Sequence, residues 1–114
     1  METNKTRIIK DYEKLSDEIK EQIKLVFQDG YSQHLIQFRN AQGEIVSALP
    51  FETFDVKYMI RMSVSKANQL IEKDPDYDDD GNLKKNAREK YEDEHADIDY
   101  LTENETYEEM DYDD

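Results

Sequence analysis

The apolar residues of this 114-residue chain are concentrated in its first part, and this distribution limits where a core can form. All four Phe and all four Val residues precede residue 72. A hydrophobic core must therefore be built mainly from about seventy residues, a length at which burial only just offsets the loss of chain entropy. We expect one small domain, whose packing would gain from any further helix that docks on it.

Charge divides at the same point. Residues 1–71 contain ten Lys/Arg and ten Asp/Glu residues, whereas residues 72–114 contain five and nineteen, so the second part accounts for the whole net charge of −14. A neutral part followed by an acidic one is typical of a folded domain with an interaction segment. We therefore expect an α+β domain at 1–73, an acidic turn and helix at 74–101 docked on that domain, and an acidic tail at 102–114 that is disordered when free.

Several protein classes are excluded by what the sequence lacks. Without cysteine there are no disulfides, thiolate metal sites or cysteine nucleophiles, and the composition fits a reducing compartment. The first residues, Met-Glu-Thr-Asn-Lys, are not followed by an apolar signal region, and no stretch approaches the roughly 18 apolar residues of a membrane span. The sequence predicts a cytoplasmic protein with no membrane partner.

A helix is predicted over residues 17–28, with Ser16 as its N-cap and Gly30 as its stop. Ile19, Ile23 and Phe27 recur at helical spacing and give it one apolar face. The preceding stretch, 7–15, leaves two alternatives open. It could contain a short strand that begins at the two isoleucines 8 and 9, or a separate helical turn.

Three strands are predicted next, at 34–39, 44–49 and 54–62, with Pro50 breaking the run between the second and the third. Apolar and polar residues alternate along 54–62, as in a sheet with one face on a core and one in water. A helix then begins near Ser65 and ends at Asp74-Pro75. The predicted fold is α+β, a small antiparallel three-stranded sheet with helices packed on one face in the order α-β-β-β-α, plus an acidic C-terminal helix.

The acidic part also contains an apolar pattern. At 100° per residue, five residues project into a sector of about 80°: Leu83, Ala87, Tyr91, Ile98 and Leu101. This narrow stripe predicts a helix that docks on the domain or on a partner and keeps a carboxylate-rich outer face.

Residues 76–83 resemble the first eight positions of an EF-hand or dockerin-type calcium loop, with carboxylates at positions 1, 3 and 5 and Gly81 at position 6. The resemblance implies a Ca²⁺ or Mg²⁺ site on Asp76, Asp78, Asp80 and Asn82. Position 12 is Ala87 rather than a bidentate carboxylate, and two lysines follow the loop. The alternative is an acidic turn in which Gly81 makes the bend and the aspartates cap the next helix.

Signatures of catalysis are absent from the sequence. No serine lies in a G-x-S-x-G context, and the three glycines form no phosphate loop. His34 and His95 have no second ligand at metal spacing, so we expect both on the surface. The sequence predicts no catalytic residue, no cofactor and no enzyme. Direct nucleic-acid binding is also excluded, because the acidic part would repel phosphates.

Three segments, 8–15, 46–53 and the turn into Gly81-Asn82-Leu83, are similar to those of a group of short acidic bacterial proteins of unknown function. The similarity spans most of residues 7–101. It implies a bacterial cytoplasmic origin and brings no activity, ligand or catalytic residue.

Function is therefore predicted from charge. We expect a non-enzymatic protein-binding module that presents its acidic helix and tail to a basic partner surface, as a mimic of nucleic acid. One alternative is a tail that only solubilises the protein. The other is a weak divalent-cation protein that uses the turn at 76–82.

Overall fold

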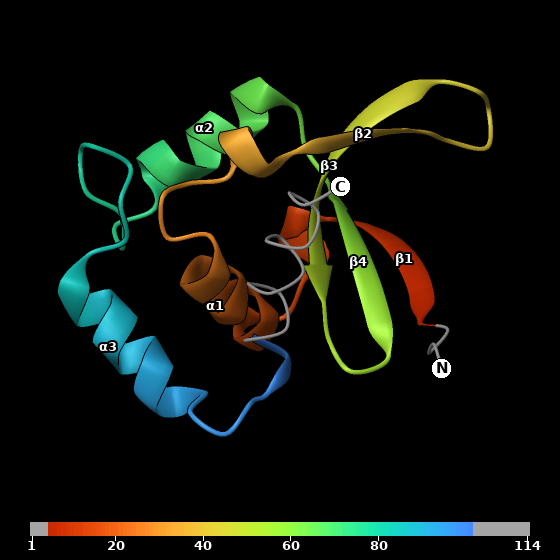
Figure 1. Cartoon of the computed structure of the whole chain (residues 1–114). Coiled ribbons are helices and arrows are strands. Elements are labelled where there is room, and N and C mark those ends of the chain that lie inside the picture. Colours follow the sequence, from red (N-terminus) through yellow and green to blue (C-terminus); the bar gives the residue numbers. More distant parts are fainter. Residues whose placement is uncertain (1–4, 102–114) are drawn as a thin grey trace, which may run out of the picture.

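The computed structural model describes residues 5–101, which form a four-stranded sheet with helices on one face (Figure 1). Along the chain the elements are β1 (Thr6–Asp11), η1 (Tyr12–Lys14), α1 (Asp17–Val26), η2 (Ser32–His34), β2 (Ile36–Arg39), β3 (Ile45–Glu52), β4 (Val56–Arg61), α2 (Val64–Lys73) and α3 (Lys85–Glu94). The sheet order is β1-β4-β3-β2. β2, β3 and β4 are antiparallel neighbours, whereas β1 is parallel to β4.

The predicted three-stranded antiparallel sheet in the order α-β-β-β-α is therefore wrong, although the α+β class holds. Stretch 7–15 contains both of the alternatives considered, because strand β1 is followed directly by the single turn η1. Thr6 pairs with Val56 and Asp11 with Arg61, about fifty residues further along the chain. No local pattern indicates a partner at that distance, and β1, at the sheet edge, lacks the apolar–polar alternation seen along 54–62.

β3 also runs through Pro50, where the sequence predicts a break. The hydrogen bond from Met62 N to Ser47 O, 3.2 Å long, fixes the antiparallel register, in which Pro50 lies opposite Met59 with its nitrogen facing away from β4. On the other side, the paired part of β2 does not reach Pro50, since the nearest β2–β3 pair joins Ile36 to Ala48. The missing N–H group therefore costs no ladder hydrogen bond.

Helices α1 and α2 cover one face of the sheet and enclose the main core. Ser16 caps α1 as predicted, since its Oγ accepts the N–H of Ile19 at 3.2 Å. The cap of α2 is Ser63 rather than Ser65, with a 3.0 Å bond from the N–H of Lys66. Nine buried residues form the core: Leu15, Ile23, Phe27, Tyr31, Leu49, Phe51, Ile60, Met62 and Ala67.

Helix α3 lies on the far side of α1 from the sheet (Figure 1). Leu83, Ala87 and Tyr91, the first three residues of the predicted stripe, are buried with Leu25 of α1 and with Tyr77. The helix ends at Glu94 instead of continuing toward residue 101. Beyond it the chain turns, and Ile98 and Leu101 are half-buried. The predicted tail, 102–114, lies outside the described residues. No helix in the described part is long and apolar enough to cross a membrane.

Candidate functional site

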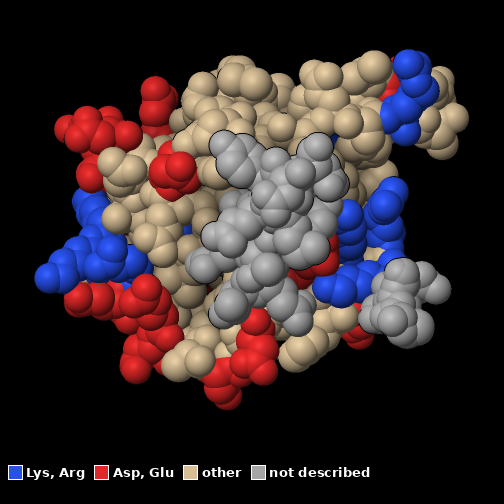
Figure 2. Space-filling model, in the orientation of Figure 1, with Lys and Arg blue, Asp and Glu red and all other residues tan. Residues whose placement is uncertain are grey.

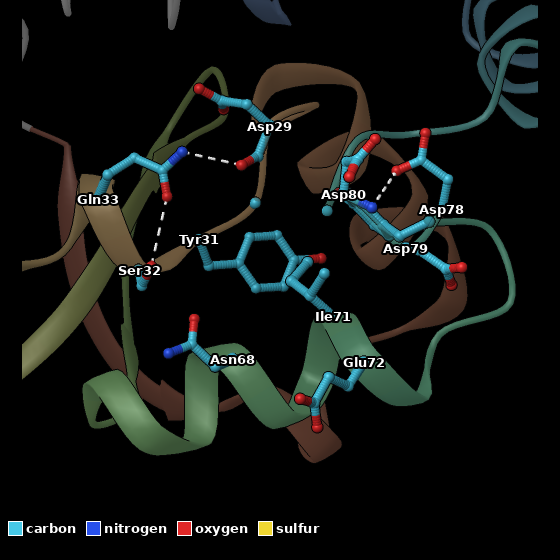
Figure 3. Close-up of a pocket in the computed structure, with 13 residues that line it drawn as sticks. Asp29, Tyr31, Ser32, Gln33, Asn68, Ile71, Glu72, Asp78, Asp79 and Asp80 are labelled. Atoms are coloured by element: carbon cyan, nitrogen blue, oxygen red, sulfur yellow. Dashed lines mark hydrogen bonds between the residues drawn. The ribbon is translucent and has the colours of Figure 1, made fainter.

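An open pocket of about 670 Å³ lies between α2, the segment around η2 and the turn that leads to α3 (Figure 3). Five carboxylate residues line it: Asp29, Glu72, Asp78, Asp79 and Asp80. Neutral polar side chains and the apolar Tyr31, Ile71 and Tyr77 complete its wall. Among the described residues no Lys or Arg contributes to the lining, so negative charge accumulates there.

The acidic turn is held in shape by its own backbone. Gly81 adopts a φ of +83°, which favours glycine, and its N–H donates to Asp78 O at 3.0 Å. One carboxylate oxygen of Asp78 accepts the N–H groups of Asp80, at 2.9 Å, and Asn82, at 3.0 Å. A short antiparallel bridge between Tyr77 and Leu83 closes the base of the turn. The turn therefore presents its three successive aspartates in a defined arrangement.

The four residues of the predicted calcium loop do not line one common pocket in the structure. Asp78 and Asp80 line the acidic pocket, whereas Asn82 lines a smaller pocket beside Arg88. Asp76 is bound elsewhere: its Oδ2 lies 2.8 Å from Lys24 Nζ and accepts the Tyr91 hydroxyl at 2.6 Å. A cation held by all four residues would have to share the Asp76 carboxylate with Lys24 and Tyr91. The alternative prediction is an acidic turn bent at Gly81 whose aspartates cap the next helix, and only its first part agrees with the structure. Gly81 does make the bend, but α3 starts at Lys85, and its N-cap residue Lys84 makes no side-chain cap hydrogen bond.

Lys24 is the cation to which this segment is anchored. Its Nζ lies 2.7 Å from Asp74 Oδ2 as well as 2.8 Å from Asp76 Oδ2, and only 11% of its side chain is exposed. Burial alone would lower the pKa of Lys24, but its hydrogen bonds to the two carboxylates outweigh burial and hold that pKa well above its usual value. Burial likewise opposes ionisation of Asp76, and the bonds from Lys24 and Tyr91 outweigh it, so the pKa of Asp76 is lowered.

The pocket wall also contains groups that the sequence did not single out. Asp29 receives a 3.0 Å contact from Nε2 of His34. Burial would raise the pKa of Asp29, but the hydrogen bond and charge of His34 outweigh burial and lower it, so the carboxylate stays ionised at neutral pH. Asp29 comes from a position far from the acidic turn in sequence, whereas Glu72 lies six residues before Asp78, at the end of α2. Only the fold brings Asp29 beside Asp78.

Tyr31 is almost fully buried, and its hydroxyl makes no hydrogen bond within the described structure. The hydroxyls of Tyr12 and Tyr77 lie close to it without reaching bonding geometry, and Tyr77 donates instead to Phe27 O at 2.9 Å. Burial raises the pKa of Tyr31 far above its ordinary value. Tyr31 therefore stays neutral and gives the pocket an apolar wall.

The acidic surface differs from the predicted carboxylate-rich helix. Helix α3 itself contains three basic and four acidic residues, and the basic Lys84 precedes it. The strongly acidic segments are 74–80, before the helix, and 92–99, at its end. Figure 2 shows this division on the side of the molecule where α3 lies, with acidic surface above and below a basic band. The described surface therefore has two acidic patches, of which the first contains the pocket.

Comparisons of the chain with protein-family models, with curated proteins and with solved structures found no match. Its function is therefore argued from the residues of the site alone.

Proposed function

We propose that the protein is a bacterial, cytoplasmic, non-enzymatic protein-binding module that receives a basic segment of a partner at the acidic pocket. One observation carries the proposal: five carboxylate residues line a single open pocket without a described cation among them. A Lys or Arg side chain supplies the missing charge. This is more specific than general attraction between an acidic protein and a basic one.

The shape of the wall suits a long basic side chain. The charged head of the Lys or Arg would meet the aspartates of the turn, while its aliphatic stem would lie against the half-buried Ile71. Arg would fit best, because its planar guanidinium can donate two hydrogen bonds to one carboxylate.

A single exposed ion pair contributes at most about 1 kcal/mol, so recognition requires a partner with several basic residues. The seven acidic residues of 103–114 and the second acidic patch would add long-range attraction and speed the encounter. A groove that binds nucleic acid is one such basic surface, and the protein would occupy it as a competitor.

The test compares two triple variants that remove equal charge. D78N/D79N/D80N removes three carboxylates from the pocket, and D93N/D97N/D99N removes three exposed ones from the second patch. Binding of a fluorescent nona-arginine peptide to the full chain is followed by anisotropy at low and moderate salt. We expect the pocket variant to lose about tenfold in affinity and the control about threefold or less, with wild-type affinity falling as salt rises.

Equal losses in the two variants would mean that the peptide responds to net charge and not to the pocket. Failure of the wild-type chain to bind the peptide at low salt would remove the proposal altogether.

A further inference from the structure

Three metal-binding side chains meet where the end of α3 reaches α1. His95 Nε2 lies 3.0 Å from Glu21 Oε1 and 3.9 Å from Glu94 Oε1, and the three ligand atoms all lie within 4.8 Å of one another. Glu21 and His95 are 74 residues apart in sequence. No local spacing motif could therefore report this cluster, and the expectation that His95 lies on the surface is wrong, since it is buried.

The separations fit a small divalent ion. Zn²⁺ binds nitrogen and oxygen ligands at about 2.0–2.2 Å in tetrahedral geometry, which places neighbouring ligand atoms roughly 3.3–3.6 Å apart. The two measured distances to His95 Nε2 fall on either side of this value. The third separation, between Glu21 and Glu94, is at most 4.8 Å, so an ion could enter with side-chain shifts of about an ångström.

Burial divides the cluster into a fixed part and an open part. The His95 side chain is 7% exposed and that of Glu21 26%, whereas 43% of the Glu94 side chain is exposed. The first two ligands would be held by the fold. The third ligand, Glu94, is open to water, and a water molecule could supply the fourth ligand.

The chemistry of the ligands selects the class of ion. An imidazole nitrogen favours Zn²⁺ and its transition-metal neighbours over Ca²⁺ and Mg²⁺, which prefer oxygen ligands alone. Two carboxylates would balance both charges of the ion. Lys24 and Lys90 lie about one helical turn from Glu21 and Glu94, but Nζ of each lies over the ring of Tyr91.

From this geometry we propose that Glu21, Glu94 and His95 bind one divalent transition-metal ion, with Zn²⁺ as its representative. The site is separate from the acidic pocket and would join α1 to the end of α3. A hydrogen bond between His95 Nε2 and Glu21 Oε1 would give the same 3.0 Å distance, so the test must distinguish a bound ion from this hydrogen bond.

The experiment is a calorimetric titration of the full chain with ZnCl₂ at pH 7.5, repeated with E21Q, H95Q and E94Q. E92Q is the matched control, since Glu92 lies on the same helix outside the cluster. We expect one ion per chain with wild type and E92Q, and at least about tenfold weaker binding with E21Q and H95Q. Long-range ¹H–¹⁵N spectra should show a Zn²⁺-induced shift at Nε2 of His95. Zn²⁺ should also raise the thermal midpoint of wild type but not of H95Q.

The exposed position of Glu94 makes E94Q the variant that keeps the fold, and far-UV circular dichroism of the metal-free proteins checks this for all of them. The absence of saturable binding to wild type would show that the hydrogen bond to Glu21, and not an ion, holds His95 in place. Binding that survives in all three ligand variants, but is lost in D78N/D80N, would move the ion to the acidic turn. Either result overturns the proposal.

Discussion

Lys24 brings a positive charge into the narrow space between α1 and the chain that follows α2. Two carboxylates, Asp74 and Asp76, meet it at 2.7 and 2.8 Å, and the hydroxyl of Tyr91 on α3 completes the cluster through Asp76. Three elements therefore depend on one ammonium group. A charge in this position stabilises the fold only while its partners are present.

Replacing Lys24 by Met should lower the free energy of unfolding by about 2–4 kcal/mol, because two largely buried carboxylates would lose their only direct counter-charge in the cluster. Urea denaturation at pH 7 measures the change. The control is K85M, where 78% of the side chain is exposed and the expected change is below about 0.5 kcal/mol. Equal stabilities for the two variants would contradict this account of the Lys24 cluster.

The same cluster predicts a dependence on acid. The pKa of Asp76 is lowered in the folded state, so the stability that Asp76 contributes is fully present above its unfolded pKa of about 3.9 and is lost as pH falls through the folded pKa. The difference in unfolding free energy between wild type and K24M should therefore shrink below about pH 4. Urea denaturation of both proteins between pH 3 and 7 tests this, and a difference that stays constant would exclude Asp76 as the titrating group.

Tyr31 gives a prediction of opposite sign. Its hydroxyl is buried without a hydrogen bond, so Y31F should leave stability unchanged or raise it by up to about 1 kcal/mol. Y77F removes a hydroxyl that donates to Phe27 O at 2.9 Å and should lower stability by about 1–2 kcal/mol. Thermal and urea unfolding of the pair give the comparison. A clear loss in Y31F would mean that this hydroxyl has a partner in solution.

At the scale of elements, the signals that succeeded were local. The cap at Ser16 and the spacing of Ile19, Ile23 and Phe27 suffice for α1, because each acts within a few residues. What depends on distant parts of the chain was missed. β1 pairs with a strand fifty residues away, and Pro50 is tolerated only because β2 ends beside it.

The candidate sites follow the same division. Asp78 and Asp80 were singled out from their own loop and do line the pocket, but Asp29 and Glu72 were not. The sequence offered one weak signal for Asp29, its position just before Gly30 at the end of a predicted helix. Nothing in it indicated that Glu21 would face His95.

The parallel pairing of β1 can be tested with two prolines. The N–H of Thr6 donates to Asp55 O at 3.1 Å, and the register repeats this donation at every second residue. The N–H of Lys10 thus faces β4, whereas that of Ile9 faces the open edge. We expect K10P to destabilise the protein by at least about 1 kcal/mol more than I9P, since only K10P removes a ladder hydrogen bond. Urea denaturation of the two variants measures this. The reverse order would refute the register.

For the whole molecule the dominant quantity is a net charge of −14 on 114 residues. Self-repulsion of this size opposes the compact state and is screened by salt. Raising NaCl from 50 to 300 mM should therefore raise the thermal midpoint by a few degrees, and by less in D93N/D97N/D99N, where three acidic charges are gone. Differential scanning calorimetry tests both statements. A midpoint that falls with salt would mean that ion pairs such as that of Lys24 outweigh the repulsion.

The sheet order β1-β4-β3-β2 also has a consequence for how the chain is made. β1 is synthesised before the other three strands of the sheet, and among the described residues it pairs with β4 alone, so it must wait, unpaired, while α1 and the β2–β3 hairpin form. Closing that long loop is costly in entropy and slow compared with forming a hairpin. We therefore expect the N-terminal strand to dock late in folding, after the rest of the sheet has provided the edge on which it pairs.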